Sequence, residues 1–235
     1  MHTINLPDYI LERAELLRGS RDRLFDITDP ARTAHVVVDL QNGFMREGAP
    51  VEVPMARKIV PNVNRISADL RAAGGRVVFL RYTYDPAEPF SWSTWYREML
   101  TPGAAEGQME AFAAGAPDHR LWDELDIVDG DLIVDKTRFS GFVPGTSGLH
   151  DLLTNAGIDT LIITGTLTNC CCECTARDAN QLNYRVIFVS DGNATHTDAD
   201  HNATLANMMT LFADVQTTDQ VLANISNSRH SSRAA

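Results

Sequence analysis

The fold class is decided by the stretch Ala34-His35-Val36-Val37-Val38-Asp39. This short run is rich in β-branched residues and does not alternate polar with apolar positions, which is typical of a strand buried on both faces, as in parallel sheets. Apolar residues then recur at helical spacing over residues 59–73, and Gly74-Gly75 ends that helix. Residues 76–82 predict a second strand, so the segment forms one strand–helix–strand unit.

The same alternation continues toward the C-terminus. Strands are predicted at residues 131–136, 160–165, 185–191 and 214–217, with helices ending at residue 155 and spanning residues 171–182, 198–212 and 218–225. Alternating strands and helices predict an α/β fold of three layers, α/β/α, around a mainly parallel, doubly wound sheet with Rossmann-like topology.

The chain is predicted to have one main domain, residues 31–227, preceded by a helical arm over residues 1–30 and followed by a polar tail over residues 228–235. Within the domain the periodic pattern is lost between residues 83 and 122, where proline and glycine recur among aromatic residues. We interpret this segment as a long irregular excursion, and such excursions are often functional.

Composition excludes several classes of protein. The 235 residues are 44% hydrophobic and 22% charged, as in ordinary globular domains, and 20 Lys and Arg against 31 Asp and Glu give a net charge of −11. That charge repels phosphate backbones and anionic lipids, so neither nucleic acid nor a membrane is expected as a partner. All 4 cysteines lie within residues 170–174, which excludes a disulfide framework and favours the cytoplasm.

Three reactive positions follow ends of predicted strands: Asp39, Lys136 and the cysteine cluster. Ligands of such sheets bind beyond the carboxyl ends of the strands, so one pocket is expected to collect all three. A cysteine in the first helical turn is expected to have a lowered pKa, and backbone N–H groups there can hold an oxyanion. No histidine lies nearby in sequence, so a partly desolvated Asp39 is the candidate base. Lys136 is expected to hold the Asp39 carboxylate and the thiolate in position relative to each other.

Each of these residues also has an ordinary structural interpretation. Buried cysteines pack where helix meets sheet, an aspartate after a strand is commonly a turn residue, and a lysine there commonly extends to solvent. Taken together, the motifs around these residues favour a catalytic role over a purely structural one.

Three segments resemble the isochorismatase-like cysteine hydrolases. Residues 39–44, Asp-Leu-Gln-Asn-Gly-Phe, resemble the opening Asp-x-Gln-x-x-Phe signature of that family. Residues 135–142 resemble its lysine segment and residues 164–179 its cysteine segment. All three occur in order, and the resemblance extends from about residue 34 to residue 221.

The resemblance implies a catalytic triad of Asp39, Lys136 and Cys171. It also implies a cis peptide between Thr166 and Leu167, with the backbone N–H groups of Leu167 and Cys171 as the oxyanion hole. In this interpretation Cys171 attacks a carbonyl after losing its proton to Asp39, an amine or ammonia leaves, and water hydrolyses the thioester. The remaining thiols, Cys170, Cys172 and Cys174, are interpreted as core residues.

The resemblance also narrows the reaction. Nicotinamidases of the family carry an Asp-x-His metal motif, whereas residues 50–54 contain no histidine, so no metal and no cofactor are predicted. Members that cleave the vinyl ether of isochorismate lack the nucleophilic cysteine. Residues 138–142 resemble ureidoacrylate and N-carbamoylsarcosine hydrolases, which predicts a metal-independent hydrolase of the C–N bond of a small non-peptide amide or carbamoyl compound.

The predicted substrate-binding residues are Phe44, Trp92, Trp95, Tyr96, Arg138 and Phe142. The aromatic residues of the excursion are equally compatible with covering the core or a subunit interface. Arg138 and Arg81 suit either a substrate carboxylate or structural ion pairs. His196 and His201, near Asp198 and Asp200, lack a third metal ligand at a recognised spacing.

Two other functions remain open from sequence. One is an isochorismatase-type ether hydrolase that uses Asp39 without a covalent step. The other is a non-catalytic thiol sensor or binding protein in which the cysteines respond to oxidants. By resemblance, the assembly is expected to be a homodimer or homotetramer.

Overall fold

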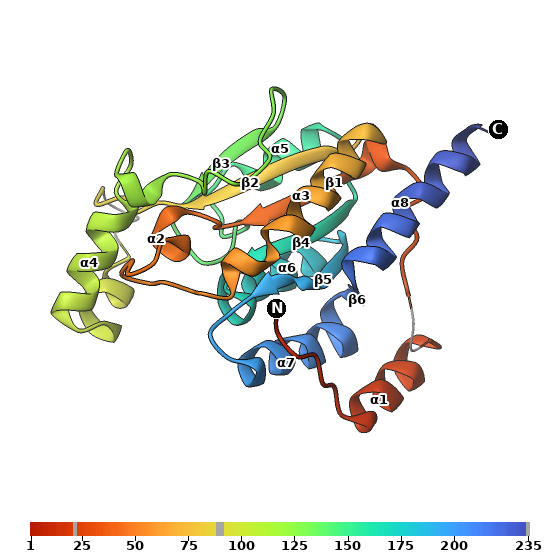
Figure 1. The fold of residues 1–235 in the computed structure, drawn as a ribbon, viewed down its shortest axis with the longest axis horizontal. Helices are drawn as coiled ribbons and strands as arrows, with labels where there is room; N and C mark the ends of the chain where they lie inside the picture. The colour runs from red at the N-terminus through yellow and green to blue at the C-terminus, as the bar shows by residue number, and fades with distance from the viewer. Residues whose placement is uncertain (21–22, 88–91, 234–235) are drawn as a thin grey trace.

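The computed structural model describes residues 1–20, 23–87 and 92–233. Its centre is a six-stranded parallel sheet in the order β3-β2-β1-β4-β5-β6 (Figure 1). The strands are β1 (Thr33–Val38), β2 (Arg76–Tyr82), β3 (Leu132–Lys136), β4 (Thr160–Thr166), β5 (Arg185–Ala194) and β6 (Asp214–Gln216). This is the strand order of a doubly wound fold, which confirms the predicted class and places a topological switch between β1 and β4.

Helices cover both faces of the sheet, as Figure 1 shows. They are α1 (Asp8–Arg18), α2 (Asn42–Met45), α3 (Ala56–Ala72), α4 (Pro102–Phe112), α5 (Leu149–Asn155), α6 (Glu173–Gln181), α7 (Asp198–Asn207) and α8 (Thr218–Arg233). Shorter helical turns are η1 (Pro30–Arg32), η2 (Thr94–Met99), η3 (Pro117–His119), η4 (Thr168–Cys172) and η5 (Met208–Phe212). Core residues of α3 and α8 pack on one face of the sheet, and those of α5, α6 and α7 pack on the other. Among the described residues, none of the helices combines the length and apolarity needed to cross a bilayer.

The strand that decided the fold class is buried along its whole length. Val36 and Val38 contribute to the core beneath α5 and α6, whereas Val37 contributes to the core beneath α3. Successive side chains of a strand point to opposite faces, so a strand covered on both sides needs apolar residues at successive positions. The unbroken run of valines meets this requirement.

His35 is the polar exception in β1. Its Nδ1 lies 2.9 Å from Ser67 Oγ and its Nε2 lies 2.8 Å from Thr164 Oγ1, so both ring nitrogens are partnered inside the protein. Burial, assisted by the charge of Arg71, lowers the pKa of His35 to about 3. The ring is therefore neutral in the folded state, and its role is to pack within the core.

The N-terminal arm is docked on the domain. α1 packs against η5, and Arg18 forms an ion pair of 3.2 Å with the buried Asp214. Further along the arm, Ile27 is buried, and its backbone N–H donates to Asn224 Oδ1 at 2.8 Å. The arm is thus part of the folded unit, with α1 against η5 and Ile27 in the core beside α8.

Several elements differ from the sequence expectations. The excursion of residues 83–122 contains the regular helix α4, which begins at Pro102 behind the capping side chain of Thr101, a favourable position for proline. The helix expected over residues 171–182 begins with the wide turn η4, and only α6 is α-helical. α8 continues through Arg233, so it crosses the boundary at residue 228 that was expected to start a polar tail.

We predict that His35→Gln reduces the acid sensitivity of the fold. The pKa of His35 is about 3 when folded and about 6.5 when unfolded, so between pH 4 and 5.5 only the unfolded chain binds this proton. The free energy of unfolding should therefore rise with pH more steeply in the wild type than in His35→Gln, by about 1.4 kcal/mol per pH unit. Chemical denaturation across this range measures both slopes, and parallel slopes would contradict the assignment.

Candidate active site

An ion pair lies at the carboxyl edge of the sheet. Lys136 Nζ donates to Asp39 Oδ2 at 2.7 Å, and both side chains are fully buried. β2 separates β1 from β3, so Lys136 reaches across the end of β2, where its register partner is Tyr82. Its Nζ lies 5.2 Å from the centre of the Tyr82 ring and also donates to Arg138 O at 3.1 Å. The sequence prediction that Asp39 and Lys136 meet in space agrees with this geometry.

The turn after β1 holds Asp39 in place. Asp39 has a φ of 53°, a left-handed conformation that aspartate tolerates better than most residues, and its N–H donates to Leu80 O at 3.1 Å. Gln41 then ties the turn to β2: its Nε2 donates to Tyr82 O and His119 O, each at 2.9 Å, and its Oε1 accepts from Tyr82 N at 2.7 Å. The glutamine of the Asp-x-Gln signature is therefore a structural clamp.

Cys171 is brought to the same edge by the segment after β4. Gly165 has a φ of 127°, and a Cβ built there would lie 2.1 Å from Val38 O, so only glycine lets β4 approach β1 so closely. The Thr166–Leu167 peptide is cis, at the position where the family resemblance placed it. In η4, the N–H groups of Cys170 and Cys172 both donate to Leu167 O at 3.1 Å.

Burial controls the protonation of the ion pair. Burial raises the pKa of Asp39, while the charge and hydrogen bond of Lys136, together with the Cys171 side chain, act in the opposite direction. Burial also disfavours the charged lysine, but Asp39 and Cys171 outweigh it and raise the Lys136 pKa. The second carboxylate oxygen, Oδ1 of Asp39, is buried without a hydrogen-bond donor within the part of the chain that the structure describes. This oxygen is an available proton acceptor.

The thiol of Cys171 is protonated at rest. A hydrogen bond with Cys170 and then complete burial raise the Cys171 pKa well above its ordinary value, and the nearby Asp39 charge adds to this. The Cys171 pKa therefore shifts in the direction opposite to the lowering expected at a helix N-terminus, because of this hydrogen bond and burial. The same contact lowers the pKa of Cys170, the partner that is less deeply buried. Nucleophilic use of Cys171 consequently requires a base.

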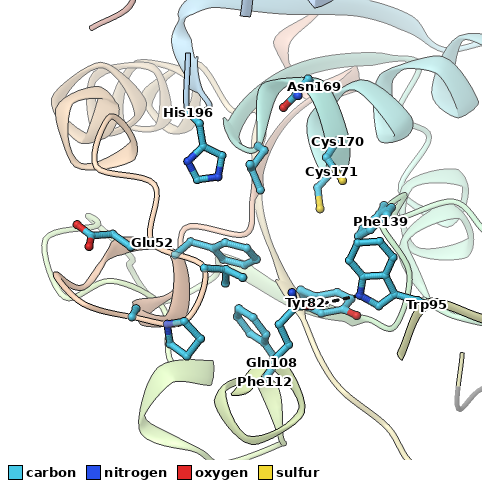
Figure 2. A pocket seen from close by; sticks show the side chains of 15 residues that line it. Glu52, Tyr82, Trp95, Gln108, Phe112, Phe139, Asn169, Cys170, Cys171 and His196 are labelled. Carbon is cyan, nitrogen blue, oxygen red and sulfur yellow. Dashed lines mark hydrogen bonds between the residues drawn. The ribbon is translucent and has the colours of Figure 1, made fainter. Parts of the chain in front are cut away.

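A cavity of about 510 Å³ opens above these groups, and Cys170 and Cys171 lie on its wall. In Figure 2 both cysteines face the space bounded by Trp95 and Phe139 on one side and Phe112 on the other. Asp39 and Lys136 do not reach the cavity surface, since they are fully buried. The thiol is thus the reactive group that a bound molecule would touch.

The predicted aromatic residues separate into two groups. Phe44 and Trp95 line the cavity. Trp92 stacks on Trp95 with ring centres 5.6 Å apart, and the Tyr96 hydroxyl lies 2.6 Å from that of Tyr82, so both support the wall from behind.

The other proposed binding residues do not line the cavity. The Arg138 guanidinium lies 5.0 Å from the centre of the Trp92 ring and donates to Thr137 O. Arg81 pairs with Asp135 at 2.7 Å, which is the structural alternative left open by the sequence. Phe142 belongs to the core on the α5 and α6 side and is not among the residues that line the cavity, although its position after Lys136 suggested proximity.

Several lining residues were missed by sequence reasoning. They come from the loop before α3, from β2, from α4 and from the segments after β3, β4 and β5, and comprise Glu52, Tyr82, Gln108, Phe112, Phe139, Asn169 and His196. Most lie in segments without a recognised motif, so only the fold reveals that they converge. The helical spacing of Gln108 and Phe112 would have placed them on one face of α4 had that helix been predicted.

The histidines after β5 do not form a metal site with their neighbours. His201 is buried between Thr168 Oγ1 and Ser190 O, each 2.9 Å from a ring nitrogen, whereas His196 is exposed at the cavity. Within the described ranges no group of three or more His, Cys, Asp or Glu side chains is arranged to hold a metal ion.

Fold and site together define an α/β protein of the doubly wound class with a thiol over a buried acid–lysine pair at the switch point. The isochorismatase domain model matches residues 33–220, and the chain belongs to the isochorismatase family. Ureidoacrylate amidohydrolase RutB of Pseudomonas savastanoi pv. phaseolicola is 35% identical over 208 residues, covering 81% of this chain and 82% of the relative.

Two solved structures extend the comparison. A cysteine hydrolase from Pseudomonas syringae pv. phaseolicola matches with a TM-score of 0.75 and 30% identity, over 85% of this chain and 95% of the other. N-carbamoylsarcosine amidase from Thermoplasma acidophilum matches with a TM-score of 0.64 and 27% identity, over 80% and 97% of the two chains. These matches confirm the predicted family.

We predict that Asp39 titrates above the ordinary range of an aspartate. Burial raises its pKa and the Lys136 charge limits the rise, so Lys136→Met should move the titration to still higher pH. Infrared difference spectra against Asp39→Asn isolate the protonated carboxyl band. Arg81→Met is the matched control, because it removes a neighbouring cation that pairs with Asp135. A titration at the ordinary pKa, or an equal shift in both variants, would contradict this prediction.

Proposed function

We propose that this protein hydrolyses the C–N bond of a small ureido or amide compound through a thioester or thiocarbamate on Cys171. The observation that carries the proposal is the arrangement of a cavity-facing thiol above a buried carboxylate that keeps one oxygen unpartnered and the other on Lys136. The relatives named as ureidoacrylate amidohydrolase and N-carbamoylsarcosine amidase support this bond type.

Asp39 is the base in this mechanism. The Cys171 proton moves to Asp39 as the thiolate attacks the substrate carbonyl, so a free thiolate need not accumulate at the raised Cys171 pKa. The raised pKa of Asp39 makes it a stronger base and partly offsets the raised pKa of Cys171, which on its own would widen the difference between donor and acceptor. Lys136 keeps the carboxylate oriented and its charge compensates the anion that passes between carboxylate and sulfur.

The tetrahedral oxyanion is proposed to rest on the backbone N–H groups of Leu167 and Cys171, which belong to the segment beginning at the cis peptide. Protonated Asp39 then returns its proton to the departing nitrogen, and ammonia or an amine leaves. Water activated by Asp39 attacks the acyl group and releases Cys171. A ureido substrate yields a carbamate at this stage and an amide yields a carboxylic acid.

The proposed function includes a cellular location and an oligomeric state. Four cysteines are all unbridged, which suits a reducing cytoplasm. The family resemblance supports a homodimer or homotetramer, and light scattering of the purified protein measures that assembly.

We predict that Cys171→Ala abolishes ammonia release from amides and ureas, by roughly a thousandfold or more, because it removes the attacking atom. Ammonia is measured with a coupled assay over a panel of ureido and amide compounds. Cys174→Ala is the matched control, since this thiol lies in α6, directly after η4, but not on the cavity wall, and its turnover should stay close to wild type. Substantial turnover by Cys171→Ala would contradict the mechanism.

A further inference from the structure

The walls of the cavity are mainly aromatic and aliphatic. On one side the rings of Trp95 and Phe139 meet edge to face with centres 5.0 Å apart. On the other, Phe44 and Phe112 lie with ring centres 4.7 Å apart. Figure 2 shows the Cys171 sulfur directed into the space between the Phe139 and Phe112 sides. A volume of about 510 Å³ is within the range, roughly 300–1,000 Å³, of cavities that enclose a whole drug-sized ligand.

Among the described lining residues the one carboxylate is that of Glu52, and it forms an ion pair with Arg57, which does not line the cavity. Among the described lining residues there is no lysine or arginine, and residues 88–91 contain none in the sequence. Glu52 lines the cavity, and its carboxylate accepts from Gly48 N and Arg57 Nη2, each at 2.8 Å. These hydrogen bonds lower the Glu52 pKa, so the side chain is anionic near neutral pH.

The nearby arginines are held by other groups. Arg81 is bound by both oxygens of Asp135, at 2.7 and 3.0 Å. Arg138 lies over Trp92, and neither arginine forms part of the cavity wall. A carboxylate brought into this space would lose its water without gaining a lysine or arginine partner among the described lining residues, which is costly.

The polar groups that a ligand does meet include neutral ones. Gln108 Oε1 accepts from Trp95 Nε1 at 3.1 Å, which leaves the Gln108 amide nitrogen available as a donor (Figure 2). Asn169 Oδ1 accepts from Thr195 Oγ1 at 2.7 Å, so its amide nitrogen is likewise the group left to donate. Such neutral donors suit carbonyl, ether or nitro oxygens of an uncharged molecule.

We infer that the substrate carries an uncharged aryl or branched alkyl group on its amide or urea, and that a carboxylate on this group is selected against. The inference rests on the proposed function, because it assigns the substrate class of that same site. The aryl group lies between the two aromatic walls while Cys171 faces the carbonyl. Glu52 and the net charge of −11 add electrostatic discrimination against anions.

The test uses two ureas of nearly the same shape. In 3-nitrophenylurea and 3-ureidobenzoate a planar nitro group and a planar carboxylate occupy the same ring position, so the pair differs chiefly in charge. The wild-type enzyme should hydrolyse the nitro compound with a kcat/KM at least about tenfold higher than that of the carboxylate. Ureidoacrylate, a small anionic urea, should also be a poorer substrate than phenylurea.

A variant of Glu52 measures how much its charge contributes to the selection against anionic substrates. Glu52→Gln removes the anion with little change of shape. The ratio of kcat/KM for the nitro compound to kcat/KM for the carboxylate should fall by at least about threefold in this variant. Asp219→Asn is the matched control, since it also breaks an arginine–carboxylate pair, with Arg65 on the far side of the domain, and should leave the ratio unchanged. An unchanged ratio in Glu52→Gln overturns the electrostatic part of the inference.

The outcomes separate this inference from the proposed function. If the two anionic ureas are hydrolysed as efficiently as the neutral ones, or more so, the substrate class is overturned and the C–N hydrolase stands. Absence of ammonia from every amide and urea, neutral or anionic, would overturn both. Calorimetric titration of Cys171→Ala provides a readout without turnover, in which the nitro compound should bind more tightly than the carboxylate and the reverse order would overturn the inference.

Discussion

The buried pair of Asp39 and Lys136 is the interaction on which the active edge of this protein depends. Two charges with no exposed surface have lost their hydration, and only their 2.7 Å contact and the hydrogen bonds around them offset this cost. Removing either partner would leave the other charge uncompensated, at a cost of roughly 3–5 kcal/mol. The backbone around this pair is held in place by the left-handed turn at Asp39 and by the hydrogen bonds of Gln41.

The same burial determines how the thiol can react. The Asp39 carboxylate and the fully buried Cys171 thiol both have raised pKa values, so the proton moves between two groups that both resist ionisation. Gly165 makes this contact geometrically available, since its lack of a side chain lets β4 approach Val38 and positions the turn that carries Cys171. The reactive arrangement therefore follows from the topological switch between β1 and β4 and from a lysine that crosses the end of β2.

Much of this arrangement is encoded locally and could be predicted. Three strands have the distinctive apolar pattern of a strand buried on two faces: the valine run, residues 76–82 and residues 160–165. The three motifs at strand ends carry Asp39, Lys136 and Cys171. What could not be predicted depends on contacts distant in sequence. Helix α4 contains two glycines and little periodicity, so its helical pattern is weak, yet it supplies Gln108 and Phe112. Phe142 follows the lysine motif closely but the loop directs it to the opposite core, and the Cys171 pKa reflects burial that no local pattern reports.

Two thiols, Cys170 and Cys171, face the cavity, and we assign the chemistry to Cys171 because it lies beside the Asp39–Lys136 pair. The most direct measurement is peptide mass spectrometry of wild-type enzyme acid-quenched during a single turnover of an aryl urea. We predict a carbamoyl-type mass increase located on Cys171 that disappears as product forms. An adduct on Cys170, or complete turnover with no adduct on any thiol at any quench time, would contradict this mechanism.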